Sequence, residues 1–147
     1  MITSNHDVIL GDSPRNIVID ADGNVTKKFE KKFKIDGKDS GASAMLWVCV
    51  KGLVGDAEPL DVDINGSCIG RLMPNTEASP NSWFTQMLHF SASEGSLNPN
   101  AKSDETANTI QIPGAESKGK EGKVQVQNIV ILYKAIIDEP APAAKKK

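Results

Sequence analysis

The stretch Leu60–Leu72, LDVDINGSCIGRL, decides the fold class of this chain. At its centre is Asn65-Gly66. A type I′ turn needs positive φ angles at both of its central residues, and Asn-Gly adopts them at the lowest steric cost. Apolar residues alternate with polar ones on either side of this turn, as they do in a strand with one buried face. The stretch therefore predicts a β-hairpin in a half-buried antiparallel sheet.

The two-residue loop also predicts the register of this hairpin. It pairs Ile64 with Ser67 and Val62 with Ile69, because each step away from the turn adds one residue to each strand. The buried face is then expected to hold Leu60, Val62, Ile64 and Ile69. The opposite, solvated face is expected to hold Asp61, Asp63 and Cys68.

Further runs with strand character recur at roughly ten-residue spacing, with turn-forming residues between them. They are Asn16–Ile19, Val25–Ile35, Ala44–Val50, Trp83–Phe90, Asn108–Ile112 and Val124–Ile137. This layout predicts an all-β protein, an antiparallel β-sandwich of the jelly-roll kind. A chain of 147 residues suits one such domain, which we expect over residues 1–137. Residues 138–147, DEPAPAAKKK, are predicted to form a disordered tail.

Three of these runs carry more detailed predictions. Ala44–Val50, AMLWVCV, is almost continuously apolar, which indicates a central strand buried on both faces with Trp47 in the core. Val25–Ile35 also has helical spacing between two phenylalanines, but its composition and the Asp-Gly that follows favour a strand. In Val124–Ile137 the apolar positions change parity around Asn128, which predicts either a β-bulge there or a strand that passes from an exposed to a buried environment.

Charge and cysteine content exclude some classes of function. The formal net charge is −2, too small to hold nucleic acid or an anionic membrane by its field alone. The lysine clusters, including Lys27–Lys34, are interpreted as solvated surface. The chain has neither a secretory leader at its start nor an apolar run of the ~18–20 residues that span a bilayer, so we expect a cytoplasmic or virion protein.

Cys49 and Cys68 are expected to be reduced, since a disulfide would need their strands to be neighbours.

From Ala44 onward the order of strands resembles that of the galactose-binding-like β-sandwich superfamily, which includes many carbohydrate-binding modules and discoidin-type domains. The resemblance rests on an apolar strand, an Ile-Asn-Gly hairpin, a strand led by tryptophan, an Asn-Thr-Ile-x-Ile strand and a closing strand. In this sequence they are Leu46–Val50, Asp63–Gly70, Trp83–Phe90, Asn108–Ile112 and Val126–Tyr133. The resemblance implies a jelly-roll fold and, by analogy alone, a glycan ligand. The loop Ser91–Ala107 is longer than is usual in that superfamily.

A candidate ligand site lies around Trp83, which follows the turn-rich loop Met73–Ser82. A sugar site needs an aromatic face for the C–H side of the ring and polar groups for its hydroxyls. If the loops at one end of the sandwich converge, these groups would come from Trp83, Arg71, Asn75, Asn81 and Gln86. The alternative is that Trp83 belongs to the core and Arg71 is a solvated strand end.

A second candidate site is a cation loop at Asp20, Asp22 and Asn24, whose oxygens alternate around a glycine. The loop does not follow the EF-hand pattern, because Val25 and Lys31 stand where that pattern needs a glycine and a bidentate acid. Two readings stay open, namely a structural calcium site and a plain turn. No other cofactor is expected.

No catalytic motif is recognisable in the sequence. Gly-x-Ser-x-Gly, phosphate-loop and paired-carboxylate patterns are absent. His6 lies in a start expected to be flexible, and His89 has no partner in the sequence that would make it a general base. We therefore expect a non-enzymatic module that binds a glycan or a small polar ligand through its end loops. The alternative is a structural or assembly protein, a jelly-roll subunit that binds a protein surface or its own copies.

Overall fold

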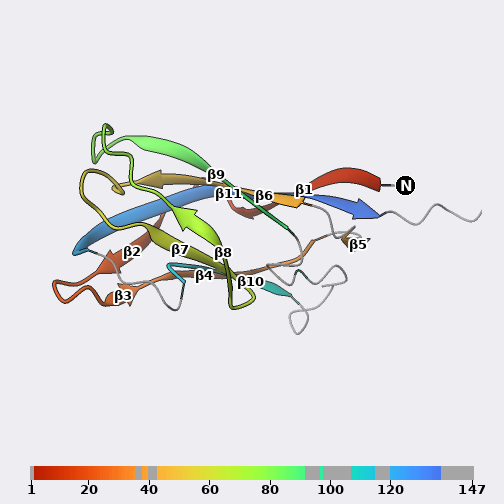
Figure 1. Ribbon diagram of the computed structural model, residues 1–147, viewed down its shortest axis with the longest axis horizontal. Coiled ribbons are helices and arrows are strands. Elements are labelled where there is room, and N and C mark those ends of the chain that lie inside the picture. The colour runs from red at the N-terminus through yellow and green to blue at the C-terminus, as the bar shows by residue number, and fades with distance from the viewer. Residues whose placement is uncertain are drawn as a thin grey trace, which may run out of the picture.

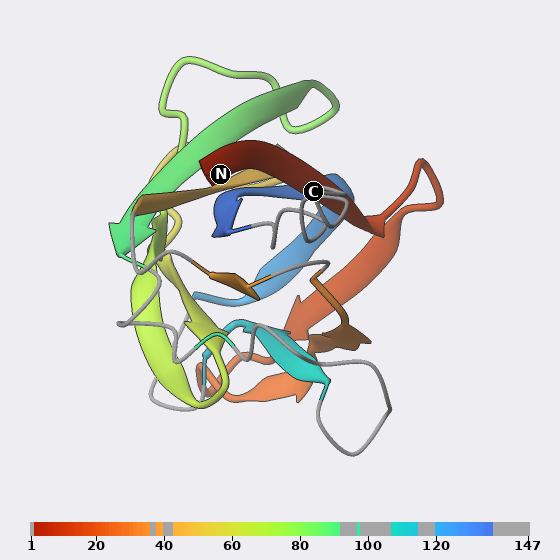
Figure 2. The same ribbon diagram turned by 90° about the vertical axis from the view of Figure 1, so that its right-hand side faces the viewer.

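The computed structural model describes residues 2–35, 38–39, 43–91, 97, 107–114 and 120–136. Every regular element in these residues is a strand, and the strands form two antiparallel sheets that lie face to face (Figures 1 and 2). The fold is thus the all-β sandwich that the alternation of residues predicted. No helix in the described residues has the length and apolar character needed to cross a membrane. The predicted tail and most of the loop Ser91–Ala107 lie outside the described residues.

The larger sheet has seven strands, and its central path runs β3-β2-β11-β6-β9. β11 is long enough to pair with β2 through its first half and with β1 through its second half, and its end also pairs with β5. The bounds are β1 Ile2–Leu10, β2 Arg15–Ile19, β3 Val25–Lys27, β5 Lys38–Asp39, β6 Ser43–Lys51, β9 Trp83–Ser91 and β11 Gly122–Ile136.

The smaller sheet has four strands in the order β4-β10-β7-β8. Its bounds are β4 Phe29–Phe33, β7 Leu60–Ile64, β8 Ser67–Leu72 and β10 Asn108–Ile112. The core lies between the two sheets, and burial of these aliphatic and aromatic side chains is the main stabilising contribution to the fold. Its most deeply buried members include Ile17, Leu46, Val48, Ile129 and Ile131 from the larger sheet and Phe29, Val62, Ile64 and Ile110 from the smaller one.

The predicted hairpin is confirmed, with one error of register. Asn65 has a φ of 52° and Gly66 a φ of 81°, as the type I′ turn requires. Ile64 pairs with Ser67 as predicted, but Val62 pairs with Gly70 and not with Ile69. One extra residue on β8 forms a bulge at this point. The bulge resets the alternation of β8, so that both Ile69 and Leu72 are buried and Arg71 faces outward.

The expectation that Asp63 lies on a solvated face is wrong. Only 7% of Asp63 is exposed, because the segment that follows β10 covers this part of β7. The Gly114 N–H donates a hydrogen bond of 2.7 Å to the Asp61 carbonyl, which holds the covering segment in place. The absence of a side chain on Gly114 leaves room for the Asp63 carboxylate directly above its Cα.

The expectation that Ala44–Val50 is buried on both faces, with Trp47 in the core, is also wrong. β6 is a central strand between β11 and β9, as predicted. However, only Ala44, Leu46, Val48 and Val50 face the core, and 42% of Trp47 is exposed. The outer face of this antiparallel sheet is open to solvent here, which parallel sheets with helices on both faces do not allow.

Val25–Ile35 forms two strands and no helix. β3 ends at Lys27 and pairs with β2 in the larger sheet, whereas β4 begins at Phe29 and pairs with β10 in the smaller one. The chain thus passes from one sheet to the other at Lys28. This passage joins the two layers along one side of the sandwich (Figure 1).

Two further predictions concern strand pairing near β11. Of the two alternatives at Asn128, the β-bulge is confirmed, because the register of β11 with β6 shifts between Gln127 and Val130. Asn128 has a φ of 49°, and its N–H donates a hydrogen bond of 2.8 Å to the Gly11 carbonyl. The expectation of a flexible start is wrong, since His6 lies within β1 and pairs with Leu132.

Candidate functional site

The residues proposed for a loop site do not form one convergent set. Trp83 and Gln86 lie on opposite faces of β9, because they are three positions apart along an extended strand, in which successive side chains alternate between the faces. The Lys51 ammonium lies over the Trp83 ring at 4.9 Å from its centroid, a cation–π contact. Gln86 instead hydrogen-bonds the backbone of Met73, accepting from its N–H at 2.8 Å and donating to its carbonyl.

Of the other three proposed residues, Arg71 and Asn75 are engaged locally through their side chains and Asn81 through its backbone. Arg71 forms a salt bridge with Asp61 across the hairpin, with 2.8 Å between Nε and Oδ1. The Asn75 side chain accepts a hydrogen bond from the Glu77 N–H at 3.2 Å and so closes a turn. Asn81 is exposed, and its N–H donates to the Ser79 hydroxyl at 3.2 Å. Both asparagines thus take part in turns of the loop that precedes β9.

The Asp20 carboxylate closes the turn between β2 and β3. Its Oδ1 accepts hydrogen bonds from the N–H groups of Asp22 and Asn24, each at 2.9 Å. This arrangement is an Asx turn, which aspartate forms without any metal. Within the described residues, no group of three or more His, Cys, Asp or Glu side chains is placed to hold a metal ion. Calcium at this loop remains a prediction.

The two cysteines are free and lie in different sheets. Cys49 is partly buried on β6, and Cys68 is exposed on β8. They belong to strands that do not pair with one another, which agrees with the expectation of reduced thiols.

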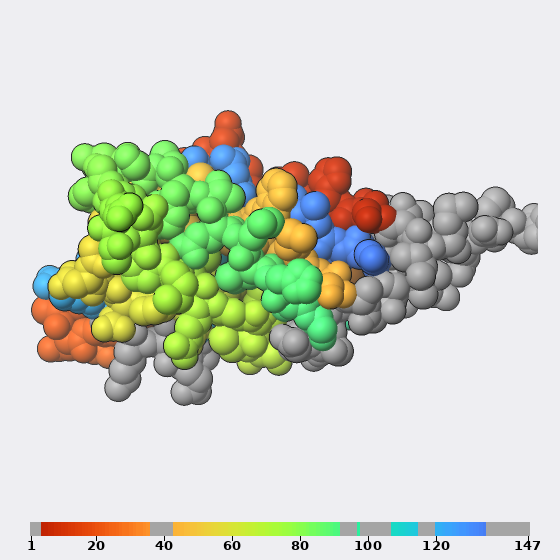
Figure 3. Space-filling view, turned by 45° about the horizontal axis from the view of Figure 1, so that its top comes forward, coloured from red at the N-terminus to blue at the C-terminus, as the bar shows by residue number. Residues whose placement is uncertain are grey.

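Sequence reasoning missed a surface on the outer face of the larger sheet. The registers of β1, β11, β6 and β9 place Val8, Val130, Trp47 and Met87 in one row across four neighbouring strands. The surfaces of these strands lie side by side in Figure 3. The exposed fractions are 63% for Val8, 42% for Trp47 and 60% for Met87. Exposure of three large apolar residues in one row is unusual for a solvated sheet.

The next row toward the end of the sheet continues the apolar surface. It runs from His6 through Leu132 and Met45 to His89, so the two histidines of the chain lie at its two ends. The Trp47 indole N–H donates to the Met45 sulfur at 3.4 Å, which orients the ring along the sheet. We use the name apolar belt for the six apolar side chains of these two rows, Val8, Val130, Trp47, Met87, Leu132 and Met45.

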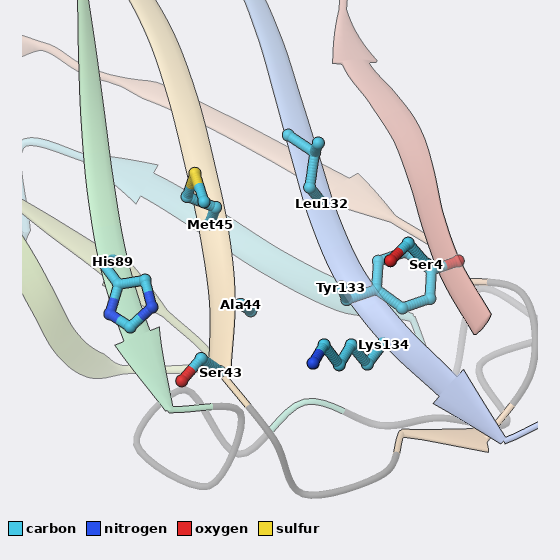
Figure 4. Close-up of a pocket in the computed structure, with 8 residues that line it drawn as sticks. All are labelled: Ser4, Ser43, Ala44, Met45, His89, Leu132, Tyr133 and Lys134. Atoms are coloured by element: carbon cyan, nitrogen blue, oxygen red, sulfur yellow. The ribbon is translucent and has the colours of Figure 1, made fainter. Parts of the chain in front are cut away.

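A hollow of about 400 Å³ lies beside the apolar belt, at the end of the sheet where β6 and β11 separate. Pairing between these strands ends at Met45 and Leu132, and beyond that pair they diverge (Figure 4). Figure 4 shows Ser43, Met45 and His89 on one side of the hollow and Ser4, Tyr133 and Lys134 on the other. The Tyr133 hydroxyl donates to Asp7 Oδ2 at 2.6 Å, which fixes this wall.

Polar side chains bound the apolar belt at the opposite end of the sheet. A row there runs from Asn16 through Gln125 and Lys51 to Trp83. The Gln125 amide donates to Asn16 Oδ1 at 2.9 Å, and Lys51 lies over Trp83. The face therefore has an apolar centre, polar groups at this end and a histidine at each side of the row at the other end, and an apolar centre with a polar rim is the usual distribution in a protein interface.

Comparisons with known proteins give no family assignment. No family model and no curated protein sequence matches the chain. Among solved structures, the chain is similar to a family 11 carbohydrate-binding module from Clostridium thermocellum in complex with a beta-1,3-1,4-mixed-linked tetrasaccharide. The sequence identity is 15%, the TM-score is 0.40, and the match covers 88% of this chain and 82% of that one. The likeness is too distant to bear on the site.

Proposed function

We propose that this protein is a non-enzymatic binding module that works through the apolar belt, and that its partner there is a second copy of the same chain. The observation that carries the proposal is the row formed by Val8, Val130, Trp47 and Met87. Nothing in this row or in the apolar part of the next one is charged. Tryptophan and methionine are enriched in protein interfaces, whereas a sugar would need hydroxyl-binding groups beside the aromatic ring.

The size of the face is close to that of a small dimer interface. Four strands span about 15 Å at the usual strand spacing, and a nine-residue strand such as β6 is roughly 30 Å long. Once side chains are included, such a face approaches the lower range of specific interfaces, which bury about 600–800 Å² on each partner. The apolar belt would supply the dry centre of this interface, and the polar rows would supply its rim.

A two-fold axis through the apolar belt makes the face complementary to itself. Each apolar row then packs against an apolar row of the other copy, so that the same patch is buried on both subunits. Stacking of two sheets face to face is an ordinary packing geometry for β-proteins. The net charge of −2 on each chain produces little repulsion between copies.

Light scattering after size exclusion, over a range of protein concentrations, tests this proposal. We expect a dimer that dissociates on dilution, and we expect Met87→Lys and Trp47→Lys to be monomeric, because each places a charge in the dry centre. Met73→Lys is the matched control, since Met73 is 54% exposed but lies outside the apolar belt. A wild-type protein that stays monomeric at every concentration would contradict the proposal, as would equal dissociation by Met73→Lys.

Glycan binding is a second candidate function, and the hollow beside the apolar belt favours it. Hydroxyl, imidazole and ammonium groups from Ser43, His89 and Lys134 line this hollow and suit sugar hydroxyls. A glycan array with wild-type, His89→Ala and Trp83→Ala proteins tests it. Loss of a signal in His89→Ala locates a glycan site in the hollow, whereas loss only in Trp83→Ala favours the loop site proposed from the sequence. Silence across the array with an intact fold counts against both sites.

A further inference from the structure

A second hollow, of about 280 Å³, lies away from the apolar belt, at the corner where the chain leaves the larger sheet for the smaller one. The end of β3 and the beginning of β4 form one wall, and the beginning of β2 forms the other. The residues that line it and matter here are Arg15, Asn16, Lys27, Lys28, Phe29 and Glu30. We refer to this hollow as the corner pocket.

The corner pocket has an excess of positive charge. Three of its lining residues are cationic and one is acidic. The Lys28 Nζ lies 3.7 Å from Glu30 Oε2, so this lysine and this glutamate form an ion pair and their charges cancel. Within the described part of the chain, Arg15 and Lys27 make no ion pair with any carboxylate. These two cations are therefore left to attract an anion from solution.

Asn16 is a neutral polar residue that also lines this pocket. Its Oδ1 accepts a hydrogen bond of 2.9 Å from the Gln125 amide. Because the oxygen of the amide is turned toward Gln125, its nitrogen is directed away from that residue and keeps its donor capacity. The pocket is thus lined by two cationic residues that make no ion pair with a described residue, Arg15 and Lys27, by the paired Lys28 and by the polar Asn16.

We propose that the corner pocket binds an oxyanion of the phosphate or sulfate type. Arginine presents parallel N–H donors that match two oxygens of such a group, and lysine adds a mobile point charge. Phe29 is only 2% exposed, so the pocket offers no aromatic face on which a base or a sugar ring could stack. The ligand is therefore recognised by its anionic group. This inference is independent of the apolar belt and of dimer formation.

Titration of the labelled protein with inorganic phosphate, sulfate and pyrophosphate, followed by amide chemical shifts at constant ionic strength, tests the site. We expect saturable shifts at residues 15–16 and 27–30. Arg15→Gln and Lys27→Gln should each weaken binding about tenfold, as the loss of one charged hydrogen-bonding group usually does. Because both side chains are exposed, these variants should retain the wild-type fold, which the same spectra report.

Lys32→Gln is the matched control for these variants. It removes the same charge from an exposed position on β4 that does not line the corner pocket. Unchanged binding in Lys32→Gln, together with weakened binding in Arg15→Gln or Lys27→Gln, supports the site. Equal weakening in all three variants would show a diffuse attraction to the lysine-rich surface and would overturn the proposal. The absence of saturable shifts with all three anions up to roughly 10 mM would also overturn it.

Discussion

The side-chain amide of Gln86 on β9 hydrogen-bonds both backbone groups of Met73, the residue that follows β8 in the other sheet. The carbonyl oxygen of Gln86 accepts the Met73 N–H at 2.8 Å, and its amide nitrogen donates to the Met73 carbonyl. Beside this contact, the Leu88 side chain packs over Gly70, where a Cβ would lie 3.5 Å from its methyl groups. These contacts join the free edges of the two sheets on the side opposite the passage at Lys28.

Replacing Gln86 should weaken this contact between the edges of the two sheets. We expect Gln86→Ala to lower the free energy of unfolding by about 1–2 kcal/mol, because two backbone groups lose their partner and water replaces it only in part. Urea denaturation followed by circular dichroism measures the change. Gln127→Ala on β11 is the control, since Gln127 makes no side-chain hydrogen bond with a described residue, and we expect a smaller effect. An equal loss of stability in the two variants would mean that the hydrogen bonds between Gln86 and Met73 do not stabilise the fold.

Asn65 has two structural roles, and two substitutions separate them. Its φ of 52° favours glycine or asparagine, while its side chain accepts from the Thr109 N–H at 2.9 Å and donates to Asn108 Oδ1 at 3.0 Å. Asn65→Gly keeps the backbone angle but loses these bonds, so we expect a loss of about 1–2 kcal/mol. Asn65→Ala also adds left-handed strain of roughly 1 kcal/mol more. Chemical denaturation of both variants checks the order, and equal stabilities would contradict the strain argument.

Gly114 has no room for a side chain. A Cβ at this position would overlap the carboxylate of Asp63, which is itself buried beneath the segment that follows β10. We expect Gly114→Ala to cost roughly 2–3 kcal/mol of stability through overpacking. A double-mutant cycle with Asp63→Ala is the test, because truncation of the carboxylate removes the overlap. The two losses should then be less than additive, whereas simple additivity would show that no clash exists.

The sequence predicted what depends on neighbouring residues along one strand. Ile64 and Phe33 lie inside because alternation places them there, and the parity change at Asn128 correctly marked a bulge. The surroundings of each strand were not predictable in the same way. Every position of Ala44–Val50 is apolar, so the pattern could not show that Trp47 faces solvent. The only sign of the exposed face in this run is that Met, Trp and Cys alternate with smaller or aliphatic side chains.

The candidate site was less predictable than the fold, because it depends on register between distant strands. Val8, Trp47, Met87 and Val130 meet only when four strands from all parts of the chain are aligned. Likewise, the partner of Gln86 is Met73, in a segment attached to the other sheet. Composition marks such residues as suitable for binding, but tertiary contacts decide whether their polar groups are already engaged.

The exposed ion pair between Lys120 and Asp56 predicts a local dependence on pH. The hydrogen bond and the charge of Lys120 hold the pKa of the Asp56 carboxyl below its ordinary value of 3.8. The pKa of Asp56 is thus lower in the folded protein than in the unfolded one. The ion pair therefore stabilises the fold at pH values above the unfolded-state pKa, and this stabilisation is lost as the pH falls through the lowered folded-state pKa. Lys120→Gln should return the pKa of Asp56 toward its ordinary value, as a carboxyl-detected NMR titration would show. Lys123→Gln, which removes the same charge nearby, should leave that pKa unchanged; an equal rise in both variants would indicate the general field of the lysines and no specific pair.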